Sequence, residues 1–392
     1  MSHYRYLIVG GGMTGDGCAR GIREEDHTGT IGLISAESHP PYNRPPLSKA
    51  LWAGRPVEKV WRHTESLDVD LHLGRTVLSL DPDRRLAVDD RGAEYTYEKL
   101  LLATGGTPRR LAFGDDHIIY FRSFDDYERL RALTGRGRTF AVIGGGFIGS
   151  EIAAALAMNG KDVIMLFPEE GVGSRIFPAG LAKSLNDYFR SKGVDVLGSE
   201  TVVDLTAQGD RVRLKTKGGR VIEADGAVAG IGIQPNTALA QAAGLDVDDG
   251  VLVDEFLNAG HPDIYAAGDV ARFYNPALGT RMRVEHEDNA NTMGKTAGLN
   301  MAGRTTPYHH LPFFYSDLFD LGYEAVGQLD GRLTLVEDWK DPFREGVVYY
   351  LRDGRVRGVL LWNVWGKVDQ ARALIAEPGP LGPADVRGRI QS

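Results

Sequence analysis

Cysteine is nearly absent from this chain, with one residue, Cys18, among 392. A single thiol cannot form an intramolecular disulfide, and the chain has no Cys-x-x-Cys pair that could serve as an internal dithiol. Redox enzymes that pass electrons to a dithiol of their own chain are therefore excluded. We expect Cys18 to be a small buried residue of a helix, because unpaired cysteines are among the most buried residues.

Long apolar runs and an excess of positive charge are also missing. No run approaches the roughly 20 apolar residues of a membrane-spanning helix, and a strand is predicted within a few residues of Met1. We therefore expect neither a membrane span nor a signal or transit peptide. Lysine and arginine number 45 against 53 aspartate and glutamate, and this net charge of −8 opposes a broad nucleic-acid-binding surface. Composition and length predict a cytoplasmic protein of two or three domains.

Glycine is abundant, with 50 residues, and its first cluster follows an apolar run near the start of the chain. Residues 7–9 predict a buried strand, which breaks into Gly10-x-Gly12-x-x-Gly15 and then a helical pattern. In a dinucleotide-binding unit, such glycines permit the tight turn, the approach of backbone to a pyrophosphate and close helix–strand packing. Glu37 lies about 20 residues further on, where such a unit places the acid for a ribose hydroxyl. Together these features predict a dinucleotide site.

The same pattern returns in the middle of the chain. Residues 139–143 predict a second buried strand, followed by Gly144-x-Gly146-x-x-Gly149 and an alanine-rich helix. Glu169 follows the next apolar strand, again about 20 residues after the last glycine. Two such units with the same order of strand, glycines, helix and acid are unlikely to arise by chance. One chain is thus predicted to bind two dinucleotides.

The segments between and after these units are rich in predicted strands. Residues 70–102 and 194–233 alternate short apolar runs with turns, which predicts antiparallel meanders. Residues 263–271 predict a strand, Gly268, and then Asp269 at a helix start, where a carboxylate caps the helix or binds ligand hydroxyls. From about residue 308 a third, α+β domain is predicted, with a hairpin turn at residues 353–354 and a helix over 368–376. We expect the proline- and glycine-rich tail from Pro378 to be loosely held.

The loop at residues 39–49 contains four prolines, which restrict its backbone torsions. Such a loop could place Arg44 and Lys49 with little entropy to lose. It could also be a stiff surface loop with two solvated cations, and composition alone favours this second interpretation. No spacing of histidine, cysteine and aspartate indicates a metal site.

Eight short motifs resemble the two-dinucleotide flavoprotein reductases, and within them apoptosis-inducing factor and its bacterial relatives, which are related to oxygenase-type ferredoxin reductases. The motifs are Arg-Pro-Pro-Leu-Ser-Lys (44–49), Ala-Thr-Gly-Gly-Thr-Pro-Arg (103–109), Gly-Gly-Gly-Phe-Ile-Gly-Ser-Glu (144–151), Leu-Phe-Pro-Glu (166–169), Val-Glu-His (284–286), Tyr-Ser-Asp-Leu (315–318), Gly-Tyr-Glu-Ala (322–325) and Tyr-Leu-Arg-Asp (350–353). The resemblance runs nearly from end to end. It implies FAD at the first glycine cluster and NADH at the second.

The resemblance also implies the fold. We expect an α/β chain with two Rossmann-like dinucleotide-binding domains of glutathione-reductase-like type and a C-terminal α+β domain. The expected FAD-binding domain is discontinuous and spans residues 1–117 and 243–307. The NAD-binding domain is expected at residues 118–242, and the C-terminal domain at residues 308–392.

The resemblance gives roles to individual residues. Lys49 and Glu151 are implied as a pair beside the flavin, with Glu151 opening the second helix, and Glu285 and His286 are implied near the nicotinamide. The full expected cofactor-binding set is Gly10, Gly12, Gly15, Glu37, Arg44, Lys49, Val77, Ala103, Thr104, Gly105, Arg109, Gly146, Phe147, Ile148, Gly149, Glu151, Glu169, Arg175, Gly232, Gly268, Asp269, Glu285, His286 and Phe314.

Three of these assignments have alternatives. The Glu169 carboxylate can accept hydrogen bonds from the ribose hydroxyls of NADH and repels the 2′-phosphate of NADPH, whereas Arg175 could bind that phosphate. We predict a preference for NADH. His286 is either a wall against the flavin or a hydrogen-bonded structural residue. Phe314 belongs to an aromatic cluster that is either core of the third domain or stacks on a cofactor.

Without a dithiol, electrons must leave for an external acceptor: a quinone, oxygen or a small redox protein. The resemblance favours an NADH oxidoreductase of the apoptosis-inducing-factor type with slow reoxidation and a homodimer linked to redox state. One alternative is an NADH:ferredoxin or rubredoxin reductase of an oxygenase system. Another is a non-enzymatic scaffold that senses NADH and recruits a partner.

Overall fold

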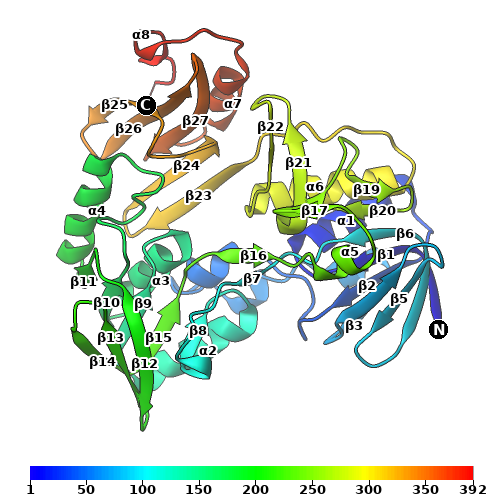
Figure 1. Cartoon of the computed structure of the whole chain (residues 1–392), viewed down its shortest axis with the longest axis horizontal. Helices are drawn as coiled ribbons and strands as arrows, with labels where there is room; N and C mark the ends of the chain where they lie inside the picture. Colours follow the sequence, from blue (N-terminus) through cyan, green and yellow to red (C-terminus); the bar gives the residue numbers. More distant parts are fainter. Residues whose placement is uncertain (392) are drawn as a thin grey trace. The chain divides into compact units, whose positions relative to one another are not determined.

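The computed structural model describes residues 1–391, which form two compact units (Figure 1). Unit 1 contains residues 1–44, 57–107 and 234–312, and unit 2 contains residues 45–56, 108–233 and those from 313 onward. Each unit has a parallel sheet with flanking helices, and unit 2 also carries two separate antiparallel sheets. This mixed α/β architecture is the one that the sequence predicts.

Unit 1 is built on a sheet whose central strand is the apolar run before the first glycine cluster. Its strands lie in the order β19 (Asn258–His261), β20 (Ile264–Ala266), β6 (Glu94–Leu102), β1 (Ser2–Val9), β2 (Ile31–Ser35) and β3 (Val69–Leu73). Strand β1 pairs in parallel with both β2 and β6, so its apolar residues are buried on both faces. The carboxyl ends of β1, β2 and β6 therefore meet at one edge of the sheet, where the glycine turn lies.

Helices α1 (Met13–Glu25) and α6 (Glu287–Met301) of unit 1 lie side by side, blue and yellow in Figure 1, and touch through glycines. A Cβ at Gly21 would lie 2.2 Å from the Lys295 carbonyl oxygen, and one at Gly298 would lie 2.1 Å from that of Cys18. Only glycine permits such close backbone contact. Cys18 is buried between the two helices, which confirms the prediction of a structural thiol.

The remaining elements of unit 1 surround this sheet. They are β4 (Val77–Asp81) and β5 (Leu86–Asp89), the strands β17 (Val247–Asp248), β18 (Gly250–Leu252), β21 (Ala271–Asn275) and β22 (Thr280–Met282), and the helical segments η2 (Val57–Lys59), η3 (Thr64–Leu67), α5 (Ala238–Ala242) and η5 (Gly268–Val270). Strands β4, β5 and β6 form the antiparallel meander predicted for residues 70–102, whereas β3 joins the parallel sheet.

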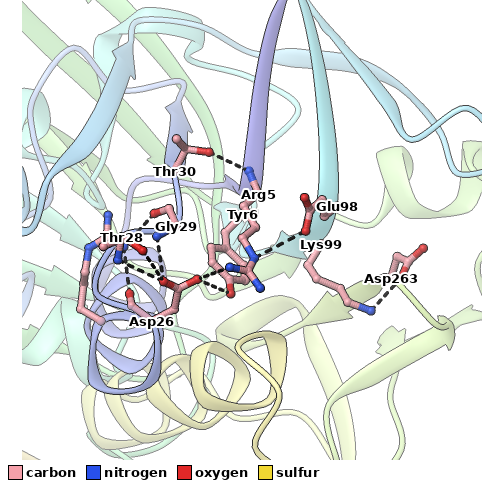
Figure 2. Close-up of polar contacts among 10 residues, drawn as sticks. Arg5, Tyr6, Asp26, Thr28, Gly29, Thr30, Glu98, Lys99 and Asp263 are labelled. Atoms are coloured by element: carbon pink, nitrogen blue, oxygen red, sulfur yellow. Dashed lines mark hydrogen bonds and ion pairs between the residues drawn. The ribbon is translucent and has the colours of Figure 1, made fainter.

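A polar network ties the start of β1 to the end of α1 (Figure 2). Asp26 accepts hydrogen bonds from the Tyr6 hydroxyl at 2.9 Å and from the backbone N–H groups of Thr28 and Gly29, and it pairs with Arg5 at 2.9 Å. Although burial opposes ionisation, the two backbone N–H groups, Tyr6 and Arg5 lower the pKa of Asp26 to about 2. This carboxylate therefore fixes where the helix ends relative to the sheet.

Unit 2 contains a second parallel sheet, in the order β11 (Val194–Leu197), β10 (Asp162–Leu166), β9 (Thr139–Ile143), β15 (Gly226–Ala229) and β8 (Ile118–Tyr120). Its helices are α2 (Phe124–Arg136), α3 (Phe147–Met158) and α4 (Ala179–Ser191), with short turns η1 (Pro45–Ser48) and η4 (Asp115–His117). The chain also forms β7 (Gly106–Pro108), β16 (Ile233–Pro235) and an antiparallel sheet of β12 (Val202–Gln208), β13 (Arg211–Thr216) and β14 (Val221–Ala224). That last sheet confirms the antiparallel meander for residues 202–224 only, because β11 and β15, at the two ends of the predicted range 194–233, join the parallel sheet.

The C-terminal sheet of unit 2 is antiparallel, in the order β23 (Phe313–Leu318), β24 (Leu321–Gly327), β27 (Arg355–Trp362), β26 (Glu345–Arg352) and β25 (Thr334–Asp341). Asp353 and Gly354 both have positive φ, as a two-residue hairpin between β26 and β27 requires, so this predicted turn is confirmed. Helix α7 (Val368–Ala376) has the predicted bounds, and α8 (Pro383–Val386) follows.

The prediction of a loosely held tail is wrong. Val386 and Ile390 are buried, the Gly388 N–H donates to Asp338 at 2.7 Å, and Arg389 pairs with Glu377. The proline- and glycine-rich composition led to the wrong prediction because Val386 and Ile390, four residues apart, are buried apolar residues of this tail. The tail is therefore part of the C-terminal fold.

Candidate dinucleotide sites

The first glycine cluster forms a cradle at the end of β1. Gly10 has φ +130°, and a Cβ there would lie 2.0 Å from the Ala103 carbonyl oxygen, so only glycine fits. A Cβ at Gly15 would lie 2.2 Å from the Gly10 carbonyl oxygen, which brings α1 against the turn. Gly12 is the N-cap of α1 and supplies no side-chain cap, and a Cβ there would meet only an Arg44 nitrogen at 3.9 Å. The first N–H groups of α1 are thus left to a ligand.

The second cluster repeats this geometry in unit 2. Gly144 has φ +116°, and a Cβ at Gly149 would lie 2.0 Å from the Gly144 carbonyl oxygen. Gly146 is the N-cap of α3, again with no side-chain cap, and a Cβ there would meet no atom within 4 Å. In both cradles the outer glycines are fixed by backbone and the middle one faces open space. That open space fits a pyrophosphate, which backbone N–H groups can bind.

The acid of the first unit belongs to a compact polar group. Glu37 accepts a hydrogen bond from the Tyr42 hydroxyl at 2.5 Å and pairs with Arg44, which also donates to the Tyr42 hydroxyl at 3.0 Å. Burial alone would lower the pKa of Arg44, but Tyr42, Glu37 and Asp269 raise it above its ordinary value. Arg44 is therefore a fixed cation beside the first cradle, and the interpretation of this loop as a surface loop with solvated cations is wrong for Arg44.

The acid of the second unit is paired as well. Glu169 follows β10, and the Arg175 Nε atom donates to its Oε1 atom at 2.7 Å. The Glu169 side chain is 25% exposed and that of Arg175 is 82% exposed, so the carboxylate lies inside and the guanidinium outside. The structure thus brings together the two residues that argue for opposite choices of cofactor.

Lys49 and Glu151 form a buried ion pair, with 2.7 Å between Lys49 Nζ and Glu151 Oε1 and side chains 13% and 4% exposed. Glu151 lies in the second turn of α3, one turn later than the helix start that we expected. Ser48 donates to Glu151 Oε2 at 2.6 Å, and Ser316 of β23 donates to Oε1 at 2.6 Å. The Lys49 ammonium also lies 5.3 Å from the centre of the Tyr315 ring.

Glu285, His286 and Asp269 lie in unit 1. Arg283 pairs with the Glu285 carboxylate at 2.6 Å and also donates to the Asp269 carbonyl oxygen at 3.2 Å, so it ties the two segments together. His286 is the N-cap of α6. Burial lowers the pKa of His286 to about 4, against the opposing charges of Asp269 and Asp288. The ring is therefore neutral at pH 7 and cannot supply a fixed positive charge.

The other expected cofactor residues fall into two groups. In unit 1, Val77 begins β4, Ala103, Thr104 and Gly105 follow β6, and Gly268 begins η5. In unit 2, the Arg109 N–H donates to the Gly232 carbonyl oxygen at 2.9 Å, Phe147 and Ile148 open α3, and half-buried Phe314 packs edge-on against Phe147 with ring centres 5.1 Å apart. Phe314 thus packs in the aromatic cluster without being fully buried, and its stacking on a cofactor stays a prediction.

Two kinds of residue were missed by the sequence reasoning. Ser48 and Ser316 stood inside recognised motifs but were given no role, although both contact Glu151. Asp16, in the first turn of α1, has a fully buried carboxylate that accepts from Arg20, Arg62 and Thr64. Despite burial, these donors lower the pKa of Asp16. An acid directly after the third glycine was the only available signal.

The fold and the two cradles define a two-dinucleotide oxidoreductase, and comparison with known proteins gives the family. The model of the family "Pyridine nucleotide-disulphide oxidoreductase" matches residues 4–294. That of "Apoptosis-inducing factor, mitochondrion-associated, C-term" matches residues 297–340 and 335–377. The chain belongs to the pyridine nucleotide-disulphide oxidoreductase family, and it is an FAD-dependent NAD(P)H oxidoreductase.

Individual relatives align along nearly the whole chain. Apoptosis-inducing factor 1, mitochondrial, of Dictyostelium discoideum is 35% identical, over 96% of this chain and 79% of that protein. The 5,5'-dehydrodivanillate O-demethylase ferredoxin reductase subunit of Sphingobium sp. is 34% identical, over 96% of this chain and 94% of that protein. A chain of the covalent putidaredoxin reductase–putidaredoxin complex is 29% identical with a TM-score of 0.90, covering 98% of this chain and 95% of that one. Among residues 1–391, none of the helices has the length and apolar character to span a membrane.

Proposed function

We propose that this chain oxidises NADH and passes the electrons through FAD to an acceptor outside the chain. When bound, the two cofactors supply hydride transfer from the nicotinamide C4 to the flavin N5, which requires the two rings to lie face to face. The observation that carries the proposal is the buried Lys49–Glu151 pair. Burying two charges is costly, and a Rossmann helix does not need them for its fold. A fixed ammonium instead stabilises negative charge as it develops on a reduced cofactor.

We assign the first cradle to FAD and the second to NADH. Gly12, Arg44 and Glu37 would hold the pyrophosphate and ribose of FAD, and Gly146 and Glu169 would do so for NADH. The inward position of Glu169 supports NADH over NADPH, since the half-buried carboxylate would meet the ribose before exposed Arg175 does.

The acceptor must be external because the only thiol, Cys18, is buried, and burial raises its pKa far above the ordinary range. Similarity to the apoptosis-inducing factor of Dictyostelium and the match of its C-terminal family model favour slow transfer to oxygen or a quinone. Under this first candidate function, reduction by NADH would also change the oligomeric state of the protein.

A second candidate is transfer to a small iron–sulfur protein. It is favoured by full-length similarity to a ferredoxin reductase subunit and to a reductase solved with putidaredoxin. The net charge of −8 gives this candidate no support, because an acidic partner would need a basic docking face.

Stopped-flow mixing of the purified yellow protein with NADH tests the proposal. Rapid loss of flavin absorbance is expected with NADH, and reoxidation in air over many seconds would favour the first acceptor class. Fast turnover only after addition of a purified ferredoxin would favour the second, and chromatographic sizing of both redox forms would show whether assembly changes. A colourless protein that takes up no FAD would contradict the proposal.

A further inference from the structure

We propose that Ser48 and Ser316 are positioning residues for hydride transfer, acting through Glu151. The inference rests on the proposed function, since it assigns a task to residues around the same ion pair. Neither serine lies in the sequence repeat that forms the second cradle, residues 139–169: Ser48 ends η1, and Ser316 lies in β23 of the C-terminal sheet. Two segments far from α3 in sequence thus supply donors to one carboxylate.

The hydrogen bonds are short and buried. Both serine Oγ atoms lie 2.6 Å from a Glu151 oxygen, within the range of a hydroxyl bonded to a charged carboxylate. The residues themselves are 4% and 1% exposed, so water cannot replace either donor. Among residues 1–391, the other partner of the Ser48 hydroxyl is the Pro45 carbonyl oxygen at 3.5 Å, which is too far to compete for its single proton.

Counting acceptor positions shows what these donors do. A carboxylate offers about four lone-pair sites, two on each oxygen. Lys49 and Ser316 occupy Oε1, and Ser48 occupies one site of Oε2. The described part of the chain thus leaves one site on Oε2, which suits a single N–H donor such as the carboxamide of nicotinamide. With three bonds from two segments, the loop at Ser48 and Lys49 and strand β23, the carboxylate cannot rotate, and Lys49 is held with it.

The consequence is a separable role for each group. Lys49 supplies charge, Glu151 holds Lys49, and the serines fix the orientation of Glu151. Removing one serine hydroxyl leaves the charges in place but frees the carboxylate to turn. Because misplacement of a positioned group can cost about 100-fold in rate, we expect the limiting rate of flavin reduction to fall roughly 10- to 100-fold.

A double-mutant cycle on the full-length FAD-loaded protein tests this inference. Ser316→Ala, Ser48→Ala and Glu151→Gln are made singly, and each serine change is also combined with Glu151→Gln. Thr134→Val is the control, because it removes a buried hydroxyl that donates only to the Arg131 carbonyl oxygen within α2. Flavin absorbance is followed at several NADH concentrations, so that the limiting rate and the apparent Kd are separated, and thermal unfolding is measured for every variant.

We expect each serine variant to reduce the limiting rate with little change in Kd, while Thr134→Val matches the wild type. In the Glu151→Gln background, removal of either serine should slow reduction by less than about threefold, since groups acting through one residue are not additive. Additive losses, or serine variants as fast as the wild type, would overturn the inference. A wild-type protein that NADH does not reduce would instead contradict the proposed function, so the two failures are distinguishable.

Discussion

Replacing Lys49 by methionine separates the contribution of the buried Lys49–Glu151 pair to folding stability from its contribution to the rate of flavin reduction. Methionine keeps most of the length of the side chain but removes its charge, leaving Glu151 at 4% exposure without a cation. Removing one partner of a buried pair costs about 3–5 kcal/mol. Because Ser48 and Ser316 still donate to the carboxylate, we expect the lower end, about 3 kcal/mol.

The effect on rate should be larger than the effect on folding. Loss of one preorganised electrostatic group lowers reaction rates by about 10²–10³, so Lys49→Met should reduce the limiting rate of flavin reduction by that factor. Adding Glu151→Gln removes the unpaired charge, and the double variant should regain stability while staying slow. Rapid mixing with NADH measures the rate, and urea unfolding measures the stability.

A matched control is available on the surface of unit 1. Lys99 pairs with Asp263 at 2.7 Å, and its side chain is 32% exposed (Figure 2). The Asp263 carboxylate is 9% exposed, but Arg85 also pairs with it, so removal of Lys99 does not leave it without a cation. Because Lys99 is partly exposed and Arg85 remains paired with Asp263, Lys99→Met should cost at most about 1 kcal/mol and should be reduced as fast as the wild type. A Lys49→Met protein that retains its FAD and is reduced at the wild-type rate would refute the assignment of Lys49.

Three further predictions follow from the geometry of the sites. Glu169→Ala should raise kcat/KM for NADPH relative to NADH by about 10- to 100-fold, since it frees Arg175 for a 2′-phosphate. Steady-state assays of Glu169→Ala, with and without Arg175→Ala, measure this ratio. An unchanged ratio in both variants would mean that the pair is not at the ribose. Gly146→Ala places its Cβ in open space and should weaken NADH binding with normal folding, whereas Gly149→Ala, at 2.0 Å from backbone, should lower the melting temperature. Asp26, with its pKa lowered to about 2 in the folded state, contributes stability above pH 4 that is lost as the pH falls towards 2, so acid unfolding curves of Asp26→Asn should be flatter than those of the wild type.

Local patterns in the sequence predicted the features that depend on backbone geometry. Glycine spacing gave both cradles because the turn, the ligand and the helix each impose a steric limit within a few residues. The Asp353-Gly354 turn and the helix at residues 368–376 were predictable for the same reason. The three-domain boundaries and the cofactor roles of individual residues stay predictions.

Features that join distant segments could not be read in this way. Ser316 reaches Glu151 across 165 positions of the chain, and no periodicity marks such a contact. The tail from Pro378 misled because its composition resembles a loop, while only the folded sheet shows where Val386 and Ile390 pack. The acceptor is set by a partner, which a single chain does not contain.

The glycine contact between α1 and α6 has a consequence for synthesis on the ribosome. The surface that α1 needs is made by residues 287–301, and β20 beside β6 is made by residues 264–266, so both emerge long after residue 25. Until then the nascent amino-terminal part carries an uncovered helix face and an unfilled sheet edge, which are hazards for aggregation. FAD uptake should therefore wait until α6, which ends at Met301, has left the ribosome, and shorter nascent chains should be clients of chaperones.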